Sequence, residues 1–162
     1  MAGPLELLGR FGLAASSSRL GGIFYHVVCR RIDSVLIPLS RGRLTLGPPG
    51  STVLMTTTGA RSGKARKAAV AFTWLGEEMV VVASKGGAPH HPGWYHNLRA
   101  HPQVRTQYNG LDEMRTAREA LGPERDKLFE QMSASFSNFP VYQKRATGRK
   151  IPVMLLAKIE SN

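Results

Sequence analysis

The spacing of apolar residues divides the chain into a helical first part and a strand-rich second part. From residue 5 to residue 39, apolar positions recur every three or four residues, which predicts one or two amphipathic helices. A segment rich in glycine and proline, 41–50, interrupts this pattern. We therefore expect an N-terminal helical extension over 1–42 and one further domain over 43–162.

Beyond that break, the pattern changes to the alternation and β-branched content of strands. Strands are predicted over 53–58, 67–75, 78–84, 103–108, 111–120 and 151–159, and helices over 92–100 and 123–136. Gly76–Glu77 and Asn109–Gly110 predict tight turns between neighbouring strands, and hence antiparallel pairing. Six such strands indicate a mainly β (α+β) fold, either a small barrel or a strongly curled sheet.

The charge of the chain indicates what kind of partner it binds, and its cysteine content indicates its redox compartment. The 22 Lys and Arg residues outnumber the 11 Asp and Glu residues, and the formal net charge of +11 points to nucleic acid, an anionic membrane or a charged small molecule. Cys29 is the only cysteine, which favours a reducing, cytoplasmic setting.

The extension has two interpretations. No apolar run approaches the ~20 residues of a membrane span, and no signal-peptide pattern is present. The predicted helices either pack on the domain or on the partner of a homodimer, or they lie peripherally on the inner face of the plasma membrane.

A first candidate site is the stretch TTTGARSGKARKAAV, 56–70. Between two predicted strands it places Arg61, Ser62, Arg66 and Lys67 among glycines. Glycines allow a tight loop, and cationic groups around such a loop form an anion site. The P-loop pattern is absent. A solvated basic hairpin is the alternative.

A second candidate site is the stretch VVVASKGGAPHHPGWYHNL, 80–98. Ser84 and Lys85 follow a predicted strand, and a helix is expected to begin at Pro92. Backbone N–H groups at a helix start, together with the Lys85 ammonium, suit a phosphate or carboxylate. Trp94 and Tyr95 offer flat surfaces for a ring system, or else pack in the core.

The sequence does not indicate a metal site or a catalytic nucleophile among the protein's own side chains. The histidines at 90, 91, 96 and 101 do not have the spacing of ligands on one helical face, and no Cys or carboxylate is close in sequence, so we expect no metal. The GxSxG pattern of a serine nucleophile is absent. A cofactor that brings its own reactivity is therefore favoured.

The two stretches, in this order, resemble the deazaflavin-dependent nitroreductase and F420H2-dependent quinone reductase family. The resemblance covers roughly 50–120 and returns at IPVMLL, 151–156. It implies a split β-barrel of six antiparallel strands, like that of flavin reductases and pyridoxamine oxidases. It also implies an oxidoreductase that passes a hydride from reduced coenzyme F420 to a quinone, a nitroaromatic or another electron-poor acceptor, without a metal.

The resemblance further implies which residues contact the coenzyme, a flat ring joined to a phosphate and an acidic tail. The cofactor-binding residues are expected to be Ala60, Arg61, Ser62, Arg66, Lys67, Ala68, Ala69, Val70, Ala71, Val82, Ala83, Ser84, Lys85, Gly93, Trp94, Tyr95, His96 and Asn97.

The acceptor side departs from the family pattern. Members often carry tyrosines before the last strand, where this chain reads FSNFPVYQKR. We expect Phe136 and Phe139 to line the acceptor site and Tyr142 to be the catalytic proton donor. Two phenylalanines favour an apolar acceptor such as a quinone.

The sequence leaves two other functions open. A non-catalytic carrier of deazaflavin, flavin or haem would share the binding features. Nucleic-acid binding is disfavoured because strands 53–58 and 78–84 contain no aromatic residue on which bases could stack.

Overall fold

The computed structural model describes residues 30–40, 43–47 and 50–159. Of the expected N-terminal extension, one helix is described, α3 (Arg30–Leu39). Cys29 and the rest of the expected helices lie outside the described residues. The domain boundary at residue 42 stays a prediction.

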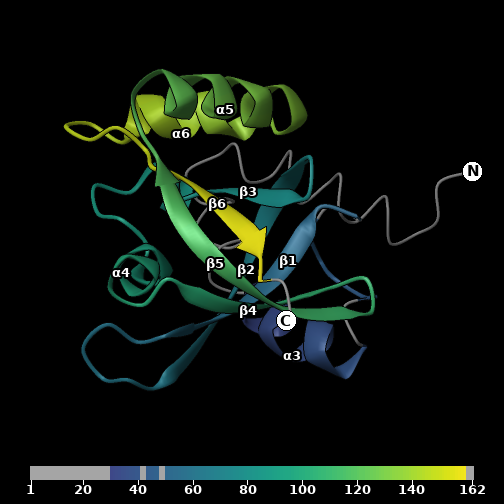
Figure 1. The fold of residues 1–162 in the computed structure, drawn as a ribbon. Helices are drawn as coiled ribbons and strands as arrows, with labels where there is room; N and C mark the ends of the chain where they lie inside the picture. The colour runs from purple at the N-terminus through teal and green to yellow at the C-terminus, as the bar shows by residue number, and fades with distance from the viewer. Residues whose placement is uncertain (1–29, 41–42, 48–49, 160–162) are drawn as a thin grey trace, which may run out of the picture.

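Six antiparallel strands close into a barrel (Figure 1). In their order around the barrel the strands are β1 (Thr52–Thr58), β2 (Ala65–Leu75), β3 (Glu78–Val82), β6 (Val153–Lys158), β5 (Leu111–Ala120) and β4 (Gln103–Tyr108), and β4 pairs with β1. The prediction of a six-stranded antiparallel split barrel is confirmed.

Both predicted hairpin turns are present. Gly76 turns β2 into β3 with φ of +58°, and Asn109 and Gly110 turn β4 into β5 with φ of +45° and +82°. Two successive positive φ values match the twist of antiparallel strands, which is why Asn-Gly is favoured at this turn.

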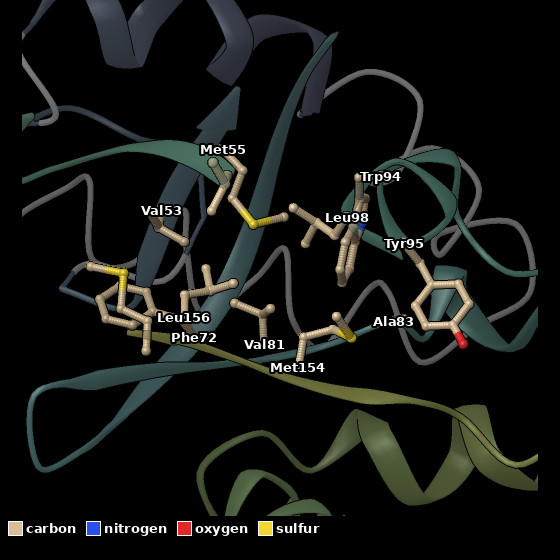
Figure 2. Packing of buried hydrophobic residues seen from close by; sticks show 12 residues of the cluster. Val53, Met55, Phe72, Val81, Ala83, Trp94, Tyr95, Leu98, Met154 and Leu156 are labelled. Atoms are coloured by element: carbon tan, nitrogen blue, oxygen red, sulfur yellow. The ribbon is translucent and has the colours of Figure 1, made fainter. Parts of the chain in front are cut away.

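Apolar side chains from most of the strands meet inside the barrel. Met55, Phe72 and Leu156 are at most 1% exposed, and Trp94 and Leu98 pack against this cluster from α4 (Gly93–Ala100) (Figure 2). Burying each such side chain stabilises the fold by about 1.5–3 kcal/mol. Helix α4 is thus fixed to the barrel by its apolar face.

Strands β3 and β6 are buried on both faces. Val81 points into the barrel, whereas Val80 and Leu155 belong to a second cluster with α5 (Gly122–Ser135) and α6 (Asn138–Arg145). The two helices lie together over these strands (Figure 1). Because neither face meets water, both strands are continuous apolar runs rather than alternating ones.

Two elements differ from the sequence-based expectation. The strand expected to reach residue 84 ends at Val82, and a single 3-10 turn, η2 (Lys85–Gly87), follows it. Lys85, Gly86 and Gly87 all have positive φ, and this conformation cannot continue a strand. Helix α6 was not expected at all.

Helix α3 packs on the barrel by an apolar contact and is tied by polar contacts to the segment 43–47 that follows it. Ile37 is 1% exposed and packs on β1 and β2. The buried Asp33 carboxylate accepts hydrogen bonds from the Thr45 hydroxyl at 2.9 Å and from the Leu46 N–H at 2.7 Å. In the part of the chain that the structure describes, no helix is long and apolar enough to cross a membrane.

Candidate functional site

A groove of about 930 Å³ lies between the β1–β2 loop and α4. Three segments line it: the end of β1 with the loop and the start of β2, the η2 turn, and the first half of α4. The described lining residues are Thr57, Gly59, Ala60, Arg61, Ser62, Arg66, Lys67, Ala68, Lys85, Pro92, Gly93, Trp94, His96 and Asn97. The two sequence stretches singled out as candidate sites therefore share one groove.

The charge of the groove is positive. Arg61, Arg66, Lys67 and Lys85 line it, and no Asp or Glu is among the described lining residues. These cations come from segments about 20 residues apart in sequence, so the fold rather than the chain order concentrates them. Such a wall attracts a ligand with more than one negative charge.

The β1–β2 loop is held in a tight turn by its own backbone. The Gly59 N–H donates to the Lys64 carbonyl at 2.9 Å, and the Gly63 N–H donates to the Gly59 carbonyl at 2.8 Å. A Cβ at Gly59 would lie 2.6 Å from Ser62 Oγ, and Gly63 has φ of +64°. Both glycines are therefore required by the geometry that turns Arg61 and Ser62 toward the groove.

Asn97 joins this loop to α4. Its Oδ1 accepts a hydrogen bond from the Ala60 N–H at 3.0 Å, and its Nδ2 donates to Thr57 Oγ1 at 3.0 Å. The Thr57 hydroxyl in turn donates to the Arg66 carbonyl at 3.2 Å. Asn97 and Thr57 are both buried, so the bond between them is shielded from water. The network fixes the distance between the two walls of the groove.

The η2 turn presents Lys85 to the groove in a conformation rare for lysine. Its φ is +49°, in the left-handed region that disfavours residues with a Cβ. Strain of this kind persists only where the surrounding structure holds it, and it concentrates at binding sites.

The aromatic residues of α4 divide between the groove and the barrel. Trp94 lines the groove but is only 5% exposed, because most of its ring packs in the barrel core (Figure 2). Tyr95 does not line the groove. Its hydroxyl points away from the core cluster and donates to the Glu119 carboxylate at 3.1 Å, and burial raises its pKa.

Some of the expected cofactor-binding residues lie outside the groove wall. They are Ala69, Val70, Ala71, Val82, Ala83, Ser84 and Tyr95, which continue β2, end β3 or lie within α4 beside lining residues. Conversely, Thr57, Gly59 and Pro92 line the groove although the motif did not assign them a contact. Each lies within three residues of an expected contact, which is the only signal the sequence offers for them.

The expected acceptor-side residues lie in the second apolar cluster. Phe136, Phe139 and Tyr142 are 7%, 6% and 5% exposed and pack with α5, α6, β3 and β6. They are not among the described residues that line the groove. Their assignment to acceptor binding and proton donation stays a prediction.

Among residues 30–40, 43–47 and 50–159, no three His, Cys, Asp or Glu side chains come together as metal ligands. The His91 Nδ1 atom lies 3.0 Å from Arg149 Nη1, so this ring nitrogen already has a guanidinium as its partner. Burial and the charge of Arg149 lower the pKa of His91.

Comparisons with known proteins agree with this geometry. The family model of the F420H(2)-dependent quinone reductases matches residues 40–158. An F420H(2)-dependent quinone reductase of Mycobacterium tuberculosis is 32% identical over 133 residues, covering 79% of this chain and 89% of the relative.

Two solved structures are also similar to this chain. One, an F420-H2 dependent reductase (FDR-A), is 39% identical with a TM-score of 0.61, over 66% of this chain and 94% of its own. The other, a domain-swapped dimer, is 34% identical with a TM-score of 0.63, over 78% and 95%. The chain belongs to the F420H2-dependent quinone reductase family.

Proposed function

We propose that this protein is an oxidoreductase that passes a hydride from reduced coenzyme F420 to a quinone or a similar electron-poor organic acceptor. The observation that carries the proposal is the groove in which the basic β1–β2 loop meets Lys85. Its volume of about 930 Å³ is within the usual range of small-molecule and cofactor sites. A flat ring with a phosphate and an acidic tail fits a groove with four cations and an indole edge.

The groove residues divide the binding between them. Arg61, Ser62, Arg66 and Lys85 are the proposed partners of the phosphate and carboxylates, since charge-assisted hydrogen bonds contribute about 1.5–3 kcal/mol each. Trp94 is the proposed aromatic contact for the ring, through the edge of the indole that lines the groove. When bound, the reduced coenzyme supplies a hydride from its C5 carbon.

We assign the remaining expected contacts to a layer of residues behind the groove wall. They are Ala69, Val70, Ala71, Val82, Ala83, Ser84 and Tyr95, which hold their neighbours Ala68, Lys85, Trp94 and His96 in place. The protein's own part is to orient the acceptor beside the coenzyme and to stabilise negative charge that develops on the acceptor oxygen. The field of Arg66, Lys67 and Lys85 has the right sign for this.

On the acceptor side, Phe136 and Phe139 are the proposed apolar contacts and Tyr142 is the proposed proton donor. The Tyr142→Phe variant removes the hydroxyl and keeps the ring. Slower acceptor reduction with unchanged coenzyme binding supports the donor role, and an unchanged rate excludes it.

Assembly and membrane contact are also proposals. A homodimer is supported by the domain-swapped dimer of the 34%-identical relative and by α3, whose Val35 and Leu39 are 66% and 83% exposed. Peripheral membrane contact is supported by the basic amphipathic pattern of the extension. Light scattering of the protein alone tests the homodimer, and light scattering after addition of anionic vesicles tests the membrane contact.

The proposed function is tested by titrating the purified protein with oxidised coenzyme F420, following its fluorescence, and then mixing the protein with F420H2 and menadione. We expect binding and menadione-dependent oxidation of F420H2. The Arg66→Gln variant should bind the coenzyme about 10- to 100-fold more weakly, because it loses a charge-assisted contact.

FMN serves as the control ligand, since it carries one phosphate and no acidic tail. No binding of coenzyme F420 at low salt contradicts the proposal. Binding without oxidation by any quinone supports the non-catalytic carrier instead.

A further inference from the structure

Arg149 makes an unusual set of contacts with the segment that carries Lys85. Its Nε donates to the Ala88 carbonyl at 2.9 Å and its Nη2 to the Ser84 carbonyl at 2.8 Å. Its Nη1 lies 3.4 Å from the Ala83 carbonyl and donates to His91 Nδ1 at 3.0 Å. One guanidinium therefore spans the segment 83–91 from end to end.

Backbone hydrogen bonds hold part of this segment, because the Ala83 N–H donates to the Pro152 carbonyl and the turn closes on the Ser84 and Lys85 carbonyls. It leaves β3 at Val82 and contains a single 3-10 turn with three positive φ values. On one side it is confined by α6, because a Cβ at Gly87 would lie 2.7 Å from the Tyr142 carbonyl oxygen. The Ala83 and Ala88 carbonyls are not acceptors in these backbone bonds, and Arg149 contacts both of them.

The chemistry of the contact requires arginine. Only a guanidinium offers five N–H donors in a fixed plane, whereas a lysine ammonium is a single point with three donors. None of the acidic residues that the structure describes forms an ion pair with Arg149. Burial lowers the pKa of Arg149. Its described hydrogen-bond partners are neutral acceptors, namely backbone carbonyls and an imidazole nitrogen. In an ordinary surface ion pair, a carboxylate would lie beside the guanidinium instead of backbone carbonyls.

We propose that Arg149 is a positioning residue for the coenzyme site, which acts by holding the segment 83–91 so that Lys85 faces the groove, with His91 as its fourth acceptor. The inference rests on the proposed function. Arg149 itself is not among the described residues that line the groove. Its effect on the coenzyme therefore passes through the segment.

The first variant is Arg149→Lys, which keeps the charge and loses the fork. We expect amide hydrogen exchange within 83–91 to accelerate about tenfold without ligand, because the shared donor is lost. The Kd for oxidised coenzyme F420 should weaken about tenfold. Since the net charge is unchanged, weaker electrostatic attraction cannot explain that loss.

Arg125→Lys is the matched control, because it likewise keeps the charge and loses the fork. The guanidinium of Arg125 is buried and also donates to a backbone carbonyl, that of Ile151, but it lies in α5 and away from the groove. We expect it to lower the melting temperature at least as much as Arg149→Lys while changing the Kd less than about threefold. If both variants change the Kd in proportion to the melting temperature, Arg149 is a structural residue only and the inference is wrong.

A pH comparison gives a readout that a structural role would not change. His91 faces Arg149, His96, Glu119, Arg99 and the ring of Tyr95. Its pKa is lowered below 6.5, so its Nδ1 is free to accept from Arg149 at neutral pH and is lost as an acceptor when the pH falls through that pKa. Coenzyme affinity should therefore fall on acidification more in the wild type than in His91→Gln, whose amide oxygen does not titrate.

The outcomes separate the two proposals. If the wild type does not bind coenzyme F420, the proposed function fails, and hydrogen exchange of 83–91 in Arg149→Lys still decides whether Arg149 holds the segment. If the wild type binds, unchanged exchange and unchanged Kd in Arg149→Lys overturn the inference alone. Equal pH profiles for wild type and His91→Gln also count against it.

Discussion

At the scale of single residues, Lys85 shows a conflict between backbone and side chain. The motif SKGG indicated a turn that binds an anion, and the turn is present. The sequence did not reveal that Lys85 itself, and not only the two glycines after it, has positive φ. Because two glycines follow Lys85, the sequence alone favours a left-handed conformation at one of the glycines and not at the lysine.

We expect Lys85→Gly to separate stability from binding. A left-handed residue with a Cβ costs about 1–2 kcal/mol, and glycine offsets part of that gain through its larger unfolded entropy. The free energy of unfolding should stay equal or rise by up to about 1 kcal/mol, while the Kd for coenzyme F420 weakens about tenfold. Urea unfolding and fluorescence titration measure the two.

Two controls accompany this variant. Lys85→Gln loses the charge and keeps the strain, so it should weaken binding without stabilising the protein. Asn109→Gly relieves a positive φ of +45° in the β4–β5 turn, which does not line the groove, and should leave the Kd unchanged. A clear loss of stability in Lys85→Gly would show that the turn is not strained.

At the scale of elements, the strands and most helices were predictable and α6 was not. Strands β1 to β5 each carry a run of valine and threonine or a turn dipeptide at one end, and β6 is a continuous apolar run; these are local signals. Helix α6, NFPVYQKR, is short and contains Pro140, which is tolerated because it lies in the first turn, where no N–H partner is needed. Its stability comes from packing with α5, β3 and β6, and no local pattern reports that.

Gly87 is the point where α6 and the η2 turn meet, so Gly87→Ala should disturb both. The new Cβ would lie 2.7 Å from the Tyr142 carbonyl oxygen and from Arg145 Cβ, at a φ of +81°. We expect a loss of about 2–4 kcal/mol in the free energy of unfolding, from backbone strain and overpacking together.

Gly76→Ala isolates the packing contribution. Gly76 also has positive φ, +58°, but an added Cβ would meet no atom within 4 Å. It should cost only the strain, about 1–2 kcal/mol. Equal losses in the two variants, measured by urea unfolding, would mean that α6 does not confine the turn.

At the scale of the whole molecule, the groove is a product of closure of the barrel. The sequence identified both of its walls, because each carries a recognisable motif. It did not reveal the bonds that join them, such as Asn97 to Ala60 across 37 residues, or Arg149 to the Ser84 carbonyl across 65. A lone asparagine or arginine has no pattern that names its partner, so these contacts need the fold.

We expect the cations of the groove, and not the net charge of the whole protein, to govern coenzyme binding. If the net charge of +11 attracted the coenzyme as a whole, removal of any one cation would matter equally. Screening shortens the reach of exposed charges to about 10 Å at 0.1 M salt, so we expect the groove cations to dominate. The Kd of the wild type should weaken about tenfold between low and high salt. Arg66→Gln should reduce that salt dependence, whereas Lys127→Gln, in α5 and outside the groove, should leave it unchanged. Equal effects of the two variants, measured by fluorescence titration across a salt series, would assign the attraction to net charge and not to the groove.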